Sequence, residues 1–127
     1  MKKSYLLFII PFLFAFQCEE EELTAGFESS YIIENNTSTT LYLLDVENRF
    51  REILPQSERA VNSVLNAETE PIPPAERLNS IRLYIMDGND FIQVYTQDPV
   101  DDLLWDFSEP VQNRFEYRLD IQESTLN

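Results

Sequence analysis

The sequence predicts an all-β protein, an antiparallel β-sandwich of about seven strands. From Phe27 onward, apolar residues recur with a period near two, which is typical of strands that bury one face. Clusters of turn-forming residues separate these runs, and the intervals lack the helices of ten or more residues that join parallel strands. A chain of 127 residues accommodates one such domain, which we place at 27–124.

The clearest strand lies at 114–121, where apolar and charged residues alternate strictly. Because successive side chains of a strand point to opposite faces, this segment is expected to bury one face and to expose the other to water. The same alternation predicts six further strands, at 30–34, 41–46, 50–54, 59–65, 81–86 and 91–96.

Two connections consist of residues that favour turns and left-handed backbone, and each is predicted to close a hairpin. They lie at 34–39 and 87–90. The segment 66–76 contains three prolines, which a central strand does not accept, so it is expected to cross between the sheets in an extended form.

Residues 99–107 depart from the period of two, because their apolar positions are three and four residues apart. This spacing predicts one short helix, with Asp98 as its cap and Pro99 in its first turn. The apolar residues expected to face the sandwich are Val100, Leu103, Leu104 and Phe107.

The first 17 residues have the layout of a secretory signal peptide, in which a helical apolar segment follows a basic start. Lys2 and Lys3 precede an apolar run of 12 residues at 5–16. At about 1.5 Å per residue, a helix of this length reaches about 18 Å, well short of an apolar membrane core of about 30 Å. The run is therefore too short to span a membrane, and residues 1–17 are expected to be removed.

Cys18 is the chain's only cysteine, and it follows the apolar run directly after Gln17. A lone cysteine at this place resembles the lipobox of bacterial lipoproteins, whose cysteine is diacylated and becomes the first residue of the mature chain. The usual lipobox has Leu, a small residue, and Gly or Ala before the cysteine, whereas this chain has Ala15 and Phe16 before Gln17. Lipoproteins of the Bacteroidota are similar in accepting bulky residues there. Two acyl chains make such anchoring stable.

Four glutamates follow the cysteine: Glu19, Glu20, Glu21 and Glu22. This run resembles the signal that exports lipoproteins of the Bacteroidota to the outer face of the outer membrane; an inward-facing anchor is the alternative. Adjacent like charges also suit a solvated tether, which we place at 18–26. The resemblance to small outer-membrane lipoproteins of this group implies a lipid-anchored protein at the cell surface, and it implies no activity.

The charge balance excludes several classes of function. The chain has 9 Lys+Arg against 23 Asp+Glu, a net charge of -14, and it has no His. Without histidine it has no Ser-His-Asp triad and no imidazole metal ligand, and with so few basic residues it is not expected to form the basic patch that nucleic acids require. Both lysines lie in the signal peptide, so Schiff-base chemistry is excluded for the mature chain. We expect no nucleic-acid partner and no cofactor, with calcium as the one alternative.

Three groups of residues are candidates for binding. Trp105, Tyr84 and Tyr95 could form an exposed aromatic platform for a sugar ring, although aromatic residues of a small sandwich usually belong to the core. Arg82, Arg114 and Arg118 could clamp an anion or pair with cross-strand acids. Six aspartates could supply oxygen ligands for calcium if their loops converge, namely Asp87, Asp90, Asp98, Asp101, Asp102 and Asp106.

These observations predict a non-enzymatic binding or accessory module that is anchored in the membrane by lipid and binds a protein or a glycan. Two alternatives stay open. A hydrolase of the glycosidase type would need two carboxylates in one cleft, one of them with a raised pKa. A purely structural spacer of the envelope would need no ligand.

Overall fold

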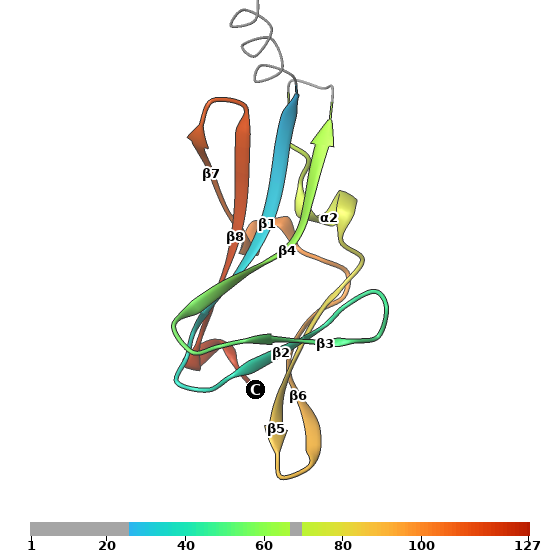
Figure 1. Ribbon diagram of the computed structural model, residues 1–127, viewed down its shortest axis with the longest axis vertical. Helices are drawn as coiled ribbons and strands as arrows, with labels where there is room; N and C mark the ends of the chain where they lie inside the picture. The colour runs from blue at the N-terminus through green and yellow to red at the C-terminus, as the bar shows by residue number, and fades with distance from the viewer. Residues whose placement is uncertain (1–25, 67–69) are drawn as a thin grey trace, which may run out of the picture.

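The computed structural model describes residues 26–66 and 70–127 of the chain. The signal peptide at 1–17, Cys18 and the glutamates at 19–22 lie outside the described residues, as does all but the last residue of the predicted tether. The described part forms two four-stranded sheets that pack as a sandwich (Figure 1). The predicted all-β sandwich is therefore confirmed.

The first sheet, sheet A, has the strand order β4-β1-β8-β7. Its strands are β1 (Phe27–Asn36), β4 (Ser57–Asn66), β7 (Asp106–Val111) and β8 (Arg114–Gln122). The two central strands, β1 and β8, run parallel, whereas the outer pairs of the sheet are antiparallel. Tyr31 of β1 lies opposite Tyr117 of β8, and their rings stack with centroids 5.8 Å apart. The first and last strands of the domain therefore form the centre of one sheet.

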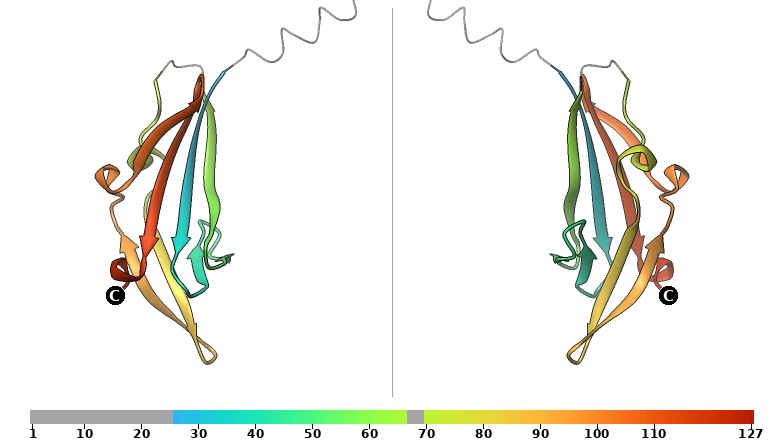
Figure 2. Two further views of the ribbon diagram at one scale, coloured as in Figure 1. Left: turned by 90° about the vertical axis from the view of Figure 1, so that its left-hand side faces the viewer. Right: turned by 90° about the vertical axis from the view of Figure 1, so that its right-hand side faces the viewer.

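The second sheet, sheet B, has the order β3-β2-β5-β6 and is antiparallel throughout. Its strands are β2 (Leu41–Leu44), β3 (Phe50–Ile53), β5 (Ile81–Asp87) and β6 (Asp90–Gln97). The predicted hairpin at 87–90 is confirmed, because it joins β5 to β6 through Gly88 at a φ of 64°. Figures 1 and 2 show this hairpin projecting beyond the sandwich, at the end opposite to the start of β1.

The core lies between the inner faces of the two sheets. In β1 every second residue from Ser29 to Asn35 is buried on this face, and β8 alternates in the same way, as predicted. Fully buried apolar side chains come from both sheets: Tyr31, Ile33, Leu41, Ile53, Ile81, Leu83 and Ile121. Each such side chain contributes about 1.5–3 kcal/mol of transfer free energy when it leaves water.

The connection between β1 and β2 corrects one prediction. Residues 34–39 were expected to close a hairpin, but β1 belongs to sheet A and β2 to sheet B, so the segment crosses between the sheets. Asn35 makes this crossing: its amide nitrogen donates to the carbonyls of Thr39 (2.8 Å) and Ile53 (2.9 Å). Its amide oxygen accepts from the backbone N–H (3.0 Å) and the hydroxyl (2.6 Å) of Thr37. Local hydrogen bonds thus replace the ladder that a hairpin would have formed.

Residues near the carboxyl terminus also stabilise the connection between β1 and β2. After β8, the short 3-10 helix η3 (Glu123–Thr125) places the Glu123 carboxylate beside Ser38. One of its oxygens accepts from the Ser38 backbone N–H (2.7 Å) and hydroxyl (2.8 Å). These two hydrogen bonds favour the ionised carboxylate and lower the pKa of Glu123.

The segment between β4 and β5 connects sheet A to sheet B, as predicted, but it is not extended throughout, because residues 74–76 are helical. It includes the short helix α2 (Pro74–Arg77). Ile72 fixes it against the inner face of sheet A, because its carbonyl accepts from the Tyr31 hydroxyl (2.7 Å) and its N–H donates to the Ser29 hydroxyl (3.2 Å). Figure 2 shows α2 and the neighbouring helix η2 beside the half of sheet A that the hairpin β5–β6 does not reach.

The short helix predicted near 99–107 is present as one 3-10 turn, η2 (Asp102–Leu104). Its cap is Asp101, whose side chain accepts from the Leu103 N–H (3.0 Å), and not Asp98. Trp105 is buried in the core together with Val100, although the helical pattern did not predict that Trp105 faces the sandwich. Leu103, Leu104 and Phe107, expected to face the sandwich, are at least half exposed.

Strand β7 begins directly after this turn and brings the count to eight, one more than the seven predicted runs. Its six residues are all exposed at the edge of sheet A, so they lack the alternation that marks a half-buried strand. Pro110, which has no N–H to donate, suits such an edge position. The missing pattern explains why the sequence did not predict this strand.

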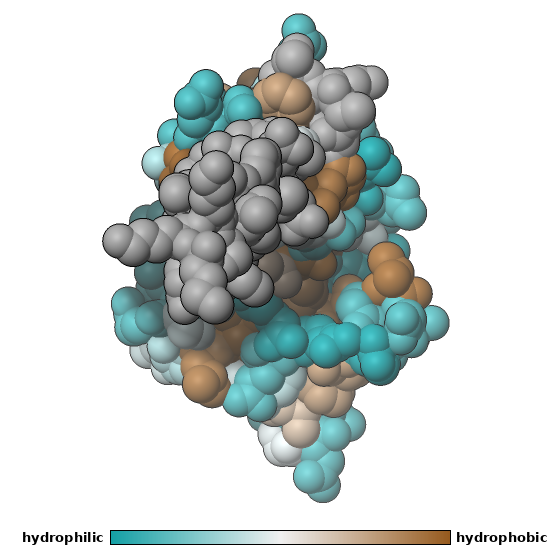
Figure 3. All heavy atoms as spheres, turned by 45° about the horizontal axis from the view of Figure 1, so that its top comes forward, coloured by the Kyte–Doolittle hydropathy of each residue, from teal (hydrophilic) through white to brown (hydrophobic). Residues whose placement is uncertain are grey.

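Figure 3 shows hydrophilic residues around smaller apolar areas on the face that it presents. Within residues 26–66 and 70–127, no helix combines the length and the hydropathy that crossing a bilayer requires.

Replacing Asn35 by Ala should destabilise the domain strongly, because it removes four hydrogen bonds at the crossing, three of them buried. We expect a loss of about 3 kcal/mol in the free energy of unfolding, measured by chemical denaturation. Asn36→Ala is the matched control: Asn36 is exposed and makes one side-chain hydrogen bond, 2.5 Å to Asp120. It should cost less than about 0.5 kcal/mol. Equal losses in the two variants would contradict the role given to Asn35.

Candidate functional site

A cavity of about 690 Å³ opens between the two sheets. It lies beside the β2–β3 hairpin and the segment that joins α2 to β5. Three segments line it: residues 43–49 with Arg51, residues 59–62, and residues 77–82. They are, in order, the β2–β3 hairpin, part of β4, and the chain from the end of α2 to the start of β5. Because both sheets and a crossing contribute, the cavity is a product of the tertiary fold.

Five of the seven arginines of the chain line this cavity: Arg49, Arg51, Arg59, Arg77 and Arg82. Only two acidic residues, Asp45 and Glu47, are among its lining residues. The chain as a whole has 23 acidic residues and a net charge of -14. The fold therefore gathers most of the positive charge of a strongly acidic protein in one concave place.

The strand registers explain why two of these arginines point toward the space between the sheets. Arg51 lies opposite Leu43 in the β2–β3 pair, and Arg59 lies opposite Ile33 in the β1–β4 pair. Leu43 and Ile33 are buried on the inner faces, and directly opposed residues share a face. Both arginines thus occupy inner-face positions at the open side of the sandwich, where their charged groups still meet solvent.

Asp45 organises the hairpin that carries Arg49 and Arg51. One oxygen of its carboxylate accepts from the backbone N–H groups of Glu47 and Arg49, both at 2.9 Å. The other lies 3.0 Å from Nε of Arg51 and 3.4 Å from Nε of Arg49. The Arg49 backbone hydrogen bond, followed by the Arg51 side chain, lowers the pKa of Asp45 to about 2. Asn48, at a φ of 59°, supplies the left-handed residue of this turn.

The remaining three arginines differ in how far their charge is neutralised. Arg82 forms an ion pair with Asp98 at 3.3 Å. Arg59 donates to the carbonyl of Glu52 at 3.3 Å, a neutral partner. Within the described ranges, neither Arg59 nor Arg77 has a carboxylate within ion-pair distance. Arg59 and Arg77 therefore supply the positive charges of the cavity that no acidic side chain of the described residues neutralises.

The aromatic platform predicted from Trp105, Tyr84 and Tyr95 is not formed. Trp105 and Tyr95 are buried, 5% and 9% exposed, and Gln97 joins them: its oxygen accepts from Trp105 Nε1 (3.2 Å) and its nitrogen donates to the Tyr95 hydroxyl (2.5 Å). Tyr84 lies apart from them in an aromatic cluster with Phe50. Trp105 and Tyr95 therefore belong to the core, which was the alternative prediction for these residues.

Sequence reasoning missed a different aromatic cluster, on the outer face of sheet B. Tyr84 lies opposite Tyr42 between the two central strands, and Phe50 and Phe91 stack on each other with centroids 3.8 Å apart. Edge-to-face contacts of 5.2 Å join Phe50 to Tyr84 and Phe91 to Tyr42. Phe50 and Phe91 stay 38% and 39% exposed. Their positions in four strands share no spacing that a sequence pattern could reveal.

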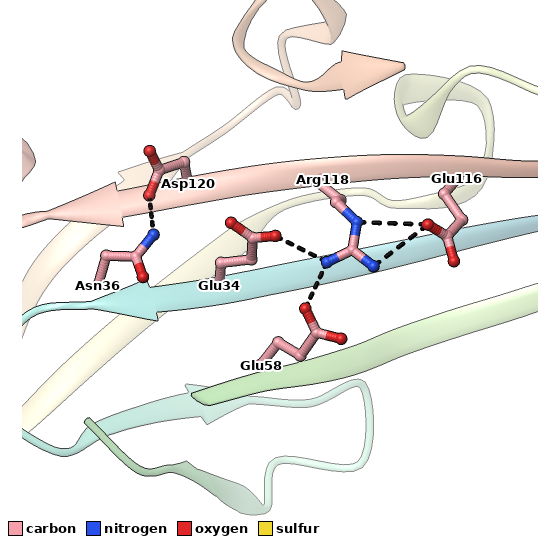
Figure 4. Close-up of polar contacts among 6 residues, drawn as sticks. All are labelled: Glu34, Asn36, Glu58, Glu116, Arg118 and Asp120. Atoms are coloured by element: carbon pink, nitrogen blue, oxygen red, sulfur yellow. Dashed lines mark hydrogen bonds and ion pairs between the residues drawn. The ribbon is translucent and has the colours of Figure 1, made fainter. Parts of the chain in front are cut away.

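All three arginines predicted to clamp an anion are paired with acids, Arg82 with Asp98 as described above. Arg118 lies on the outer face of sheet A among three glutamates, as Figure 4 shows: it donates to Glu34 at 2.7 Å, to Glu116 at 3.2 Å and to Glu58. The hydrogen bonds that it donates to Glu58 and then to Glu34 raise the pKa of Arg118. Arg114 pairs with Glu28. Only Arg82 belongs to the cavity.

Three of the six aspartates considered for calcium have other side-chain partners in the described part of the chain. Asp98 pairs with Arg82, Asp101 caps η2, and Asp102 accepts from the Ala75 N–H at 2.8 Å. Residues 26–66 and 70–127 contain no group of three or more acidic or cysteine side chains placed to hold a metal ion.

The lowered pKa of Asp45 makes a prediction for the pH dependence of stability. Because the folded carboxylate has a lower pKa than the unfolded one, its contribution is full above about pH 4 and is lost as pH falls toward about 2. Asp45→Asn removes this contribution, so its unfolding free energy should fall less steeply over that interval than the wild-type value. A carbon NMR titration of Asp45 should give a midpoint near 2; a midpoint near 4 would contradict the assigned hydrogen bonds.

The cluster around Arg118 makes a second prediction. Arg118→Met keeps the apolar stem but leaves three glutamates facing one another, so we expect a loss of about 1 kcal/mol in unfolding free energy, reduced at 1 M salt. Arg114→Met, which removes an exposed pair with a single glutamate, should cost less than about 0.5 kcal/mol. Denaturation of both variants at low and high salt measures the difference. A loss in Arg118→Met that salt leaves unchanged would point to packing instead.

Comparisons with protein-family models, with curated proteins and with solved structures found no match to this chain. The candidate site is therefore defined by the chain's own residues. It consists of the cavity between the sheets, the five arginines that line it, and the Asp45 carboxylate that fixes two of them.

Proposed function

We propose that this chain is a lipid-anchored protein of the outer membrane that faces the cell exterior and acts as a non-enzymatic binding module. One observation carries the binding role: an acidic chain places five arginines around a single cavity. A cavity of about 690 Å³ falls within the usual range of small-molecule sites, roughly 300–1,000 Å³.

The proposed anchor is Cys18, and Glu19–Glu22 are the proposed export signal. The domain supports this arrangement because β1 begins at Phe27, so residues 19–26 alone separate the anchor from the sheet. Eight residues reach at most about 29 Å when fully extended. The anchored end would be the end at which β1 starts, and the hairpin β5–β6 would point away from the membrane.

Asp45 and Glu123 give no support to the alternative of a carboxylate-dependent hydrolase. A general acid of the glycosidase type needs a raised pKa, which burial in an apolar site produces. Asp45 and Glu123 have shifts in the opposite direction, since hydrogen bonds hold both as anions. A structural spacer, the other alternative, gives no reason for gathering unneutralised arginines in a cavity.

The location can be tested by metabolic labelling with radioactive palmitate. The wild-type chain should incorporate the label and Cys18→Ala should not, because acylation needs the sulfur. A variant with all four glutamates at 19–22 changed to alanine is the matched control: it should be labelled like the wild type but lose cleavage by protease added outside the cells. Equal labelling of Cys18→Ala would refute the anchor. Unchanged external cleavage of the glutamate variant would refute the export role.

A further inference from the structure

We infer that the arginine-lined cavity binds a small organic dianion, a molecule with two oxyanion groups, such as carboxylates or phosphate oxygens, on a partly apolar body. This inference deepens the proposed binding function and rests on it. It follows from three features of the cavity: its unneutralised charge, its apolar wall and its guanidinium chemistry.

The charge of the lining sets the charge of the ligand. Asp45 and Glu47 neutralise Arg49 and Arg51 through contacts of 2.7 to 3.4 Å, and Asp98 neutralises Arg82. Arg59 and Arg77 have no carboxylate partner within the described chain, so the lining has two positive charges to spare. A ligand with two negative charges would balance them, whereas a cation would add to the positive excess of the lining.

The wall of the cavity is not wholly polar. Val61 and Leu78 line it, and both are partly buried against the hydrophobic core. Apolar lining favours a ligand whose charged groups are joined by a hydrocarbon chain or a ring, because burying that body releases water. A bare inorganic ion would leave this part of the cavity unused.

The long-range field of the protein does not favour anions, because the net charge is -14. At physiological ionic strength the Debye length is about 8 Å, so distant acidic residues are largely screened while the lining arginines are not. Recognition must therefore come from short hydrogen bonds between guanidinium groups and oxyanions, which are charge-assisted and frequently bidentate. Lysine cannot reproduce that planar geometry.

Binding can be measured by calorimetry on the whole chain in detergent. Adipate tests the carboxylate form of the ligand and phenyl phosphate the phosphate form; adipamide, the neutral analogue of adipate, is the control probe. We expect at least one dianion to bind at least about tenfold more tightly than adipamide. If neither does, the inferred ligand class is wrong.

Three cavity variants and one control locate the site. Arg59→Gln and Arg77→Gln should each weaken binding of the better dianion about tenfold or more, and Arg59→Lys should weaken it similarly although the charge is kept. Arg114→Gln lies outside the cavity and should bind like the wild type. Equal affinity in wild type, Arg59→Gln and Arg77→Gln would overturn the assignment. Arg59→Lys keeps the positive charge inside the cavity, whereas Arg114→Gln removes one outside it. Weaker binding in the first variant and unchanged binding in the second would therefore show local recognition and not a general charge effect.

The outcomes also separate this inference from the proposed function. Dianion binding without palmitate labelling would refute the anchor and support the ligand class. Palmitate labelling with binding of adipamide equal to that of adipate would support an anchored binding module and refute the requirement for a dianion.

Discussion

The architecture depends on the buried side-chain amide of Asn35. Its four hydrogen bonds connect the end of β1, the connection that follows and the end of β3, and so fix the point where the chain leaves one sheet for the other. Because of this crossing, β2 and β3 lie across the core from β1 and β4. The cavity follows from the same crossing, since Arg51 of β3 faces it from one sheet and Arg59 of β4 from the other.

The fold class could be predicted because hydrophobic periodicity is a local property, and β8 shows it clearly from Arg114 to Gln122. The sheet to which each strand belongs is not local. The residues of 34–39 suit a hairpin turn and a crossing equally well, and only the partners of Asn35 decide between them. Strand β7 was missed for another reason: an exposed edge strand has no buried face to impose a pattern.

The candidate site was less accessible to sequence reasoning than the fold. Its five arginines are scattered from Arg49 to Arg82 and come together only through the pairing of two sheets. The three arginines chosen from strand patterns included Arg114 and Arg118, whose acidic partners on neighbouring strands were expected as the alternative. For Trp105 and Tyr95, composition favoured the core, and the shared partner Gln97 explains how their polar atoms are satisfied there.

The parallel pairing of β1 with β8 has a consequence for the order in which the domain can fold. The centre of sheet A joins residues 86 positions apart, such as Glu28 and Arg114, so it cannot assemble until nearly the whole chain has been made. Contacts of such long range slow folding. In a polypeptide that leaves the ribosome with β1 first and β8 last, the central pair of sheet A therefore forms only at the end of synthesis, after every strand of sheet B has already emerged.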